Sequence, residues 1–265
     1  MARLLCLLCL LCLLWLPRVA AAQAFDHAHR AWDALLKKHV VVLEGGKASR
    51  VRYAGMARDR AELKAYRDSL SRVGETEFRG WTGSEQMAFL INAYNAFAVE
   101  KILTRYPDIR SIWGFGKLFG NPFKDRFFAL LGRNMSLDGI EHATLRKPGA
   151  YDEPRVHYAV NCASIGCPML REEAYVPGRL DAQLEEQARR FLSDRLRNRY
   201  DPASGQLEVS EIFKWFREDF EPRERYFSRY AELLADEPRH QQLIAEGKAP
   251  IAHVEYDWKL NDAGQ

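Results

Sequence analysis

The densest group of reactive side chains lies in residues 155–168. Its members are His157, Asn161, Cys162, Ser164 and Cys167. Residues 156–160 alternate in character as a strand does, which predicts a strand that places His157 and Asn161 on one face and ends near Cys162. Functional residues are common where a regular element opens into a loop.

Three chemistries fit the two cysteines of this segment. A disulfide would close a small loop, because the four intervening residues include Gly166 and let the Cα atoms approach to about 5.5 Å. A thiolate, with His142 or His157 as base and an Asn or Glu as orienting group, has the residue types of cysteine hydrolases and acyl transferases. A metal site could use both histidines and both cysteines, but Cys-x4-Cys lacks the paired spacing of structural zinc. We expect no metal and no cofactor.

A second group lies in residues 136–142. Asp138, followed by Glu141 three residues later, predicts a variant of the capping box at a helix start, which would explain both acids. His142 has no such role, although a lone helical histidine is more often structural than catalytic. The candidate catalytic residues are Cys162, His157, His142, Glu141 and Asn92.

A third group lies on a long helix, which we expect to be capped by Thr82 or Ser84 and to reach about Tyr106. Apolar residues cover most of its circumference, so this helix should be buried and central. Asn92 and Asn95 share one narrow stripe of it, and a buried amide without a partner costs about 1–3 kcal/mol. These amides either fix a neighbouring segment or belong to a site. The candidate binding residues are Asn95, Asn161, Ser164 and Cys167.

The first 24 residues carry a leader pattern. A positive charge precedes an apolar block over residues 4–16, and a run of small residues ends at Ala24. This pattern predicts a cleaved secretory signal peptide over residues 1–24, since the block is shorter than the roughly 20 residues of a membrane-spanning helix. We expect a periplasmic or secreted protein without membrane insertion after cleavage. Cleavage leaves only Cys162 and Cys167, an even pair that an oxidising compartment allows to bond.

Composition excludes several classes of protein. The chain has 265 residues, 47% of them hydrophobic and 28% charged, as in ordinary globular domains and unlike disordered chains or disulfide-built miniproteins. Without the two leader arginines, 37 basic side chains face 36 acidic ones. No concentrated basic surface follows from this balance, so we expect no nucleic-acid partner. Phosphate-binding glycine motifs are also missing, which leaves an unknown small-molecule or peptide ligand.

The remaining pattern predicts a mixed fold. Other helices are expected at 25–40, 58–73, 138–146, 180–199, 210–220 and 223–247, and strands at 40–43, 51–53, 127–131, 134–137, 156–160, 206–209 and 251–260. Helices and strands are interspersed without a βαβ rhythm, which favours a single α+β domain with the central helix packed on a mainly antiparallel sheet. Residues 25–83 would supply an N-terminal helix and β-ribbon, and residues 84–261 the core domain.

Several of these segments resemble one family. The matching stretches are FLINAYNA (89–96), SLDGIEH (136–142) with Leu145 and Arg146, RVHYAVNC (155–162) with Ser164, Cys167 and Pro168, IFKWF (212–216) with Asp219 and Phe220, and YDWKLN (256–261). In this order, over about residues 84–261, they are similar to the family catalogued as domain of unknown function 547, found in bacteria and plants. The resemblance implies that the candidate residues belong to one module, and it brings no established activity.

A weaker similarity is to papain- or transglutaminase-like folds, in which a cysteine opens the central helix. Here Ser84 and Glu85 open the helix, so Cys162 would have to act from the far side of His157.

Two functions are therefore in competition. The first is an exported thiol- and histidine-dependent hydrolase or acyl transferase, in which Cys162 attacks, a histidine takes its proton and an amide orients the group or binds the oxyanion. The alternative is a disulfide-stapled, non-catalytic periplasmic binding or interaction domain, which would use the aromatic loop over residues 113–128.

Overall fold

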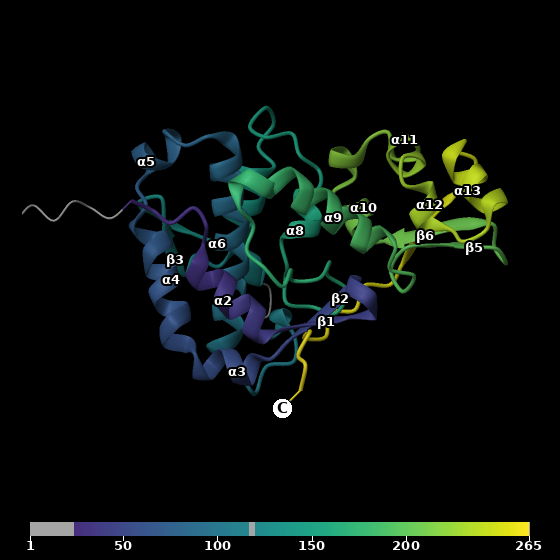
Figure 1. Cartoon of the computed structure of the whole chain (residues 1–265). Coiled ribbons are helices and arrows are strands. Elements are labelled where there is room, and N and C mark those ends of the chain that lie inside the picture. The colour runs from purple at the N-terminus through teal and green to yellow at the C-terminus, as the bar shows by residue number, and fades with distance from the viewer. Residues whose placement is uncertain (1–23, 117–119, 265) are drawn as a thin grey trace, which may run out of the picture.

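The computed structural model describes residues 24–116 and 120–264. The helix α6 (Gly83–Leu103) lies inside a hydrophobic core that the N-terminal helices help to build (Figure 1). This helix is buried along most of its length, as its all-round apolar pattern predicts. Thr82 caps it: the Thr82 hydroxyl accepts a hydrogen bond from the backbone N–H of Glu85, and the Thr82 N–H donates to the Glu85 carboxylate at 2.7 Å. The expectation of a central buried helix is confirmed.

A group of helices from the N-terminal part of the chain covers one side of α6. Its members are α2 (Arg30–His39), α3 (Tyr53–Arg58), α4 (Arg60–Arg72) and α5 (Glu75–Arg79). The helix α4 packs against α2, α3 and α6, and buried side chains of all four belong to one hydrophobic core. Residues 25–83 therefore share their core with the rest of the domain.

In the part of the chain that the structure describes, the strands form three small sheets. They are β1 (Val40–Leu43) with β2 (Ala48–Val51), β3 (Phe128–Leu130) with β4 (Arg133–Met135), and β5 (Arg199–Asp201) with β6 (Gln206–Ser210) and β7 (Ile251–Val254). All pairs are antiparallel except β6 with β7. Both predicted hairpins are present, but the second strand of the first one is Ala48–Val51 and not 51–53, since Tyr53 already begins α3. The α+β class is confirmed. The elements most closely packed on α6 are helices and helical turns.

The second half of the chain builds a second hydrophobic cluster at the other end of the molecule (Figure 1). Its helices are α9 (Leu180–Leu192), α10 (Ile212–Trp215), α11 (Arg223–Ser228), α12 (Ala231–Leu234) and α13 (Pro238–Ala245). Short helical turns connect the helices and strands along the whole described chain. They are η2 (Glu44–Gly46), η3 (Ile112–Phe115), η4 (Pro122–Lys124), η6 (Pro177–Arg179) and η7 (Arg217–Phe220).

The strand predicted for residues 156–160 is wrong. These residues form the short helix α8 (Val156–Ala159), which follows a turn that begins at Pro154. The N–H of His157 donates to the Pro154 carbonyl and that of Tyr158 to the Arg155 carbonyl, so local bonds use the donors that a strand would need. Side chains on all sides of the segment are buried, and a run this short does not separate strand from helix by its period.

The capping role predicted for Asp138 is also wrong. The helix α7 (Leu137–Ile140) begins after Ser136, whose hydroxyl accepts a hydrogen bond from the Gly139 N–H at 3.0 Å. It continues directly into a π-helical turn, η5 (Glu141–Leu145), and such wide turns often occur at functional sites. Because Ser136 performs the capping, the carboxylates of Asp138 and Glu141 are left for another purpose.

The closing segment is a strand only at its start. Beyond β7 the chain runs beside the loop after α8, where the Gly166 N–H donates to the Asp257 carbonyl and the Ile165 N–H to the Lys259 carbonyl, both at 2.8 Å. A Cβ at Gly166 would lie 2.9 Å from the Asp257 nitrogen and from the Tyr256 ring, so glycine permits this close approach. The approach sets Tyr256 against the cysteine loop.

Two expectations concern the leader and the membrane. The predicted signal peptide falls on residues 1–24, of which 1–23 lie outside the described residues. Within residues 24–116 and 120–264, no helix has both the length and the apolar character needed to cross a bilayer.

Candidate functional site

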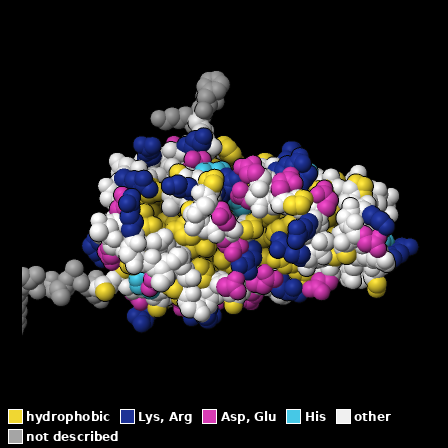
Figure 2. Space-filling model, turned by 90° about the horizontal axis from the view of Figure 1, so that it is seen from above, with side chains coloured by type: hydrophobic (Ala, Val, Ile, Leu, Met, Phe, Trp, Pro, Cys, Tyr) yellow, Lys and Arg dark blue, Asp and Glu magenta, His cyan; other side chains and the backbone are white. Residues whose placement is uncertain are grey.

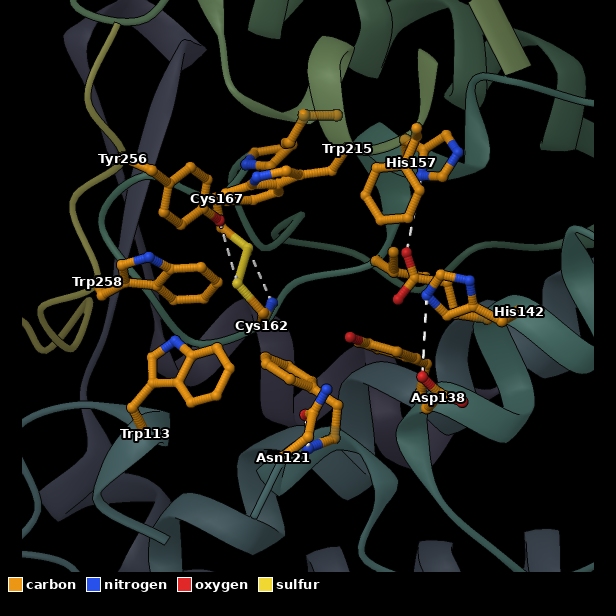
Figure 3. A pocket seen from close by; sticks show the side chains of 17 residues that line it. Trp113, Asn121, Asp138, His142, His157, Cys162, Cys167, Trp215, Tyr256 and Trp258 are labelled. Carbon is orange, nitrogen blue, oxygen red and sulfur yellow. Dashed lines mark hydrogen bonds and ion pairs between the residues drawn. A yellow bond between two sulfur atoms is a disulfide. The ribbon is translucent and has the colours of Figure 1, made fainter. Parts of the chain in front are cut away.

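A cavity of about 400 Å³ lies where the α6 core meets the C-terminal half. Side chains from widely separated segments line it: Tyr94, Trp113, Asn121, Phe123, Asp138, Glu141, His142, His157, Val160, Cys162, Cys167, Pro168, Ile212, Trp215, Phe216, Tyr256 and Trp258. Figure 2 shows hydrophobic side chains exposed in a band across the middle of one face, between charged side chains. Figure 3 shows the cavity from close by.

Aromatic side chains form one wall of this cavity. We call Trp113, Phe123, Trp215, Tyr256 and Trp258 the aromatic wall. Trp258 is its centre: its ring lies 5.3 Å from that of Trp113 at 82°, 5.5 Å from that of Trp215 at 24°, and 4.5 Å from that of Tyr256. Trp113 and Trp215 are 43% and 42% exposed, which is unusual for side chains of this size.

Polar side chains form the opposite side (Figure 3). We call Asp138, Glu141, His142 and His157 the polar side. Behind it, Arg146 binds Asp219 through two nitrogens, Nε at 2.5 Å and Nη2 at 3.2 Å. Partial burial would raise the pKa of Asp219, but hydrogen bonds from His157 and Arg146 outweigh it and lower the pKa to about 2. Asp219 is therefore an anion that anchors the polar side.

His157 is held between two carboxylates. Its Nε2 lies 2.6 Å from Oδ2 of Asp219, and its Nδ1 lies 3.7 Å from Oε1 of Glu141. The ring is buried and stacks on Phe216, with the centroids 4.1 Å apart. Nδ1 is buried and has no hydrogen-bond partner among the described residues. This nitrogen therefore faces Glu141 without a hydrogen bond to it.

Glu141 and His142 stand side by side but in different settings. The Glu141 carboxylate lies beside Tyr94, and burial together with this negative charge raises the pKa of the Tyr94 hydroxyl well above its usual value. His142 is 44% exposed and its Nδ1 lies 2.5 Å from Nη1 of Arg146. A guanidinium can only donate, so Nδ1 of His142 is the acceptor in this contact. The other nitrogen faces Asp138, at 3.9 Å.

The two cysteines lie beside the aromatic wall. Their sulfur atoms are in bonding contact and their Cα atoms are 6.3 Å apart, an arrangement that a disulfide can have (Figure 3). The hydroxyls of Ser164 and Tyr256 lie 3.1 and 3.2 Å from the sulfur of Cys162. Among the described residues, no group of three His, Cys, Asp or Glu side chains is arranged so that it could hold a metal ion.

Comparison with known proteins bears on part of this site. Residues 78–192 match the family described as "Protein of unknown function, DUF547". This segment is a DUF547 domain. No curated protein and no solved structure matches the chain. The DUF547 segment contributes the polar side and both cysteines, whereas Trp215, Tyr256, Trp258 and Asp219 lie beyond it, so the cavity is completed by residues outside the matched range.

The asparagines of the DUF547 domain serve its backbone. Asn92 donates to the Tyr175 carbonyl at 2.8 Å and accepts from the Tyr175 N–H at 3.1 Å. Asn95 bonds the Ala159 carbonyl and the Asn161 N–H in the same manner, at 2.9 and 2.8 Å. Each amide therefore fixes a neighbouring segment, which was the first of the two expected roles.

The predicted site residues thus divide into two groups. Glu141, His142, His157, Cys162 and Cys167 meet at the cavity. Asn92, Asn95, Asn161 and Ser164 lie outside its lining and shape the segments that carry it. The similarity to papain-like folds loses its main element, because His157 lies on a helix and not on a strand.

Sequence reasoning missed several residues of the site. The sequence predicts a helix cap at Asp138, and the anchor formed by Arg146 and Asp219 joins segments 73 residues apart. The aromatic wall unites residues from three distant stretches, of which the sequence indicates only the loop over 113–128 as a binding surface. The motif resemblance was the one signal available, since it includes Arg146, Asp219, Trp215 and the closing segment.

Proposed function

We propose that this protein is an exported, disulfide-closed domain that binds a small molecule or a peptide side chain in the cavity. The main observation behind this proposal is that the polar side and the aromatic wall line the same cavity, whose volume is about 400 Å³. Ligand pockets combine an apolar lining with a few converging polar groups, at volumes of roughly 300–1,000 Å³. Large aromatic side chains left exposed at such a place favour a binding role over a purely structural one.

The predicted export of the chain supports a disulfide between Cys162 and Cys167 in this proposal. The leader pattern over residues 1–24 directs the chain to an oxidising compartment, where a closely placed cysteine pair forms a disulfide. In that state Cys162 has no thiol to attack a substrate. The disulfide instead joins the two ends of the loop that holds one edge of the cavity.

Tryptophan fluorescence tests the binding function, because three tryptophans belong to the aromatic wall. A chemically varied panel of small molecules is titrated against the mature protein, and each hit is measured again by calorimetry with Trp258→Leu and Glu141→Gln. Glu232→Gln on α12 is the matched control, since that carboxylate is 62% exposed and does not line the cavity. We expect the cavity variants to lose binding and the control to keep it. Hits whose affinity is equal in all variants would place the ligand elsewhere and contradict the proposal.

One observation favours a second candidate function, hydrolysis or acyl transfer. The chain Asp219–His157–Glu141 has the order of an orienting acid, a histidine and a group beside the cavity, an arrangement suited to proton transfer. In the oxidised protein the nucleophile would be water, whereas the thiol version requires reduction of the cysteine pair. The two versions differ in a simple test on any ligand that is turned over. A double variant with serine at positions 162 and 167 keeps turnover in the first version and loses it in the second.

A further inference from the structure

We infer that the cavity is selective for a small organic cation, an alkylammonium group. This inference rests on the proposed binding function and adds the chemical class of the ligand. It is carried by the charge of the polar side and by the shape of the aromatic wall.

The charge of the cavity is one-sided. Its described lining contains the carboxylates of Asp138 and Glu141 and neither lysine nor arginine. Behind the polar side, the guanidinium of Arg146 is already bound by Asp219 and, at 2.9 Å, by Glu218. One positive charge thus stands beside four negative ones. An anionic ligand would meet uncompensated carboxylates, which is unfavourable at short range.

The histidines do not reverse this balance. Nδ1 of His142 accepts a bond from Arg146, which occupies the lone pair of that nitrogen. His157 is enclosed by Asp219, Glu141 and Phe216, and its Nε2 is bonded to Asp219. Glu141 lies beside the Tyr94 hydroxyl, and its carboxylate keeps capacity for a ligand.

The aromatic wall suits a cation better than a flat ring. Trp113 meets Trp258 at 82°, and Tyr256 meets it at 48°, so the rings form a corner and not a single platform. A sugar ring stacks on one flat face, whereas a rounded ammonium group is attracted by several ring faces at different angles. The exposed Trp113 and Trp215 give this corner an open side.

Carboxylates and aromatic rings act together on such a ligand. The carboxylates attract the positive charge of the ligand. The aromatic rings contact the methyl or methylene groups of the ligand and remove them from water. Neither group alone would select an alkylammonium ion, because an acidic cluster binds metal ions or amines equally well and an aromatic corner binds neutral apolar groups. Selectivity requires both across one cavity, as Figure 3 shows here.

The test compares choline with 3,3-dimethyl-1-butanol, which has the same shape without the charge. Titrations by calorimetry at low salt use the mature, oxidised protein. We expect choline to bind about ten-fold more tightly than the neutral alcohol. Glu141→Gln should remove most of this ratio, and Asp138→Asn provides a second variant if the first is poorly folded in its melting curve. Glu232→Gln should leave the ratio unchanged.

The outcomes separate this inference from the proposed function. Equal binding of choline and the alcohol, or tighter binding of a sugar or an anion in a Trp258→Leu-sensitive manner, overturns the cation inference and leaves the binding function standing. If every hit of the wider panel ignores the substitutions at Trp258 and Glu141, the proposed function itself fails.

Discussion

The proposed disulfide between Cys162 and Cys167 leads to a prediction whose size follows from the loop that it closes. Cys162 and Cys167 are five positions apart, so the closed loop has six residues. In the chain-entropy model such a loop contributes about 2 kcal/mol to the free energy of unfolding. For a domain of this size about 1 kcal/mol corresponds to roughly 2–4 °C, so reduction should lower Tm by about 4–8 °C. The loop has other supports, including the bond from Asn161 to the Pro168 carbonyl at 2.8 Å, which is why we expect no collapse.

The assay is a thermal melt with and without reductant, followed by alkylation under denaturing conditions and intact mass. We expect no adducts before reduction, two after it, and the stated shift in Tm between the two samples. The variant with serine at both positions serves as control, since reductant should not move its Tm. Two adducts before reduction would show free thiols. An unchanged Tm despite full reduction would refute the energetic reasoning, and loss of any cooperative melt would show that the loop has no other support.

Three further predictions concern single residues. Burial lowers the pKa of His29 to about 3 from 6.5, so below pH 6.5 the unfolded chain binds a proton at this residue and the folded chain does not. The free energy of unfolding, measured in urea, should therefore fall by about 2 kcal/mol from pH 6.5 to pH 5. His29→Gln should flatten this pH dependence, and parallel curves for the two proteins would contradict the prediction. Because the pKa of Asp219 is lowered, Asp219→Asn should reduce the free energy of unfolding by about 1 kcal/mol at pH 7, and this difference should disappear as the pH falls from 4 to 2. A difference that persists at pH 2 would exclude the ion pair as its cause. Gly166→Ala should lower stability by about 1–3 kcal/mol in the same unfolding assay, because its Cβ meets Asp257 and Tyr256, while Gly178→Ala, with open space around it, should change little; equal effects would refute the close-packing account.

Local pattern accounts for much of the fold. The helix α6 follows from apolar residues on every side, and the turn between β1 and β2 from Gly45 and Gly46, both with positive φ. The cost of an unpaired buried amide also indicated that Asn92 and Asn95 need fixed partners, which they have in the backbone.

The elements that the sequence predicted wrongly are those whose local pattern fits two structures equally well. Residues 156–160 are short and buried on all sides, so alternation carried no information, and hydrogen bonds to Pro154 and Arg155 decided for a helix. Asp138 lies two residues after the real cap, Ser136, and a side chain at either position fits a helix start. Only three-dimensional packing separates these cases.

The candidate site was accessible from sequence only where its residues are close along the chain. His157 and the cysteines lie within one segment, and Glu141 and His142 are neighbours. The aromatic wall has no such local signature, because Trp113 and Trp258 meet through the pairing of the closing segment with the cysteine loop.

The most direct test of the binding function is a crystal structure of the mature protein with the tightest ligand of the panel. We predict density for that ligand between Trp258 and the carboxylate of Glu141, in contact with both the aromatic wall and the polar side. A ligand bound on another surface, with the cavity occupied by water alone, would contradict the central claim.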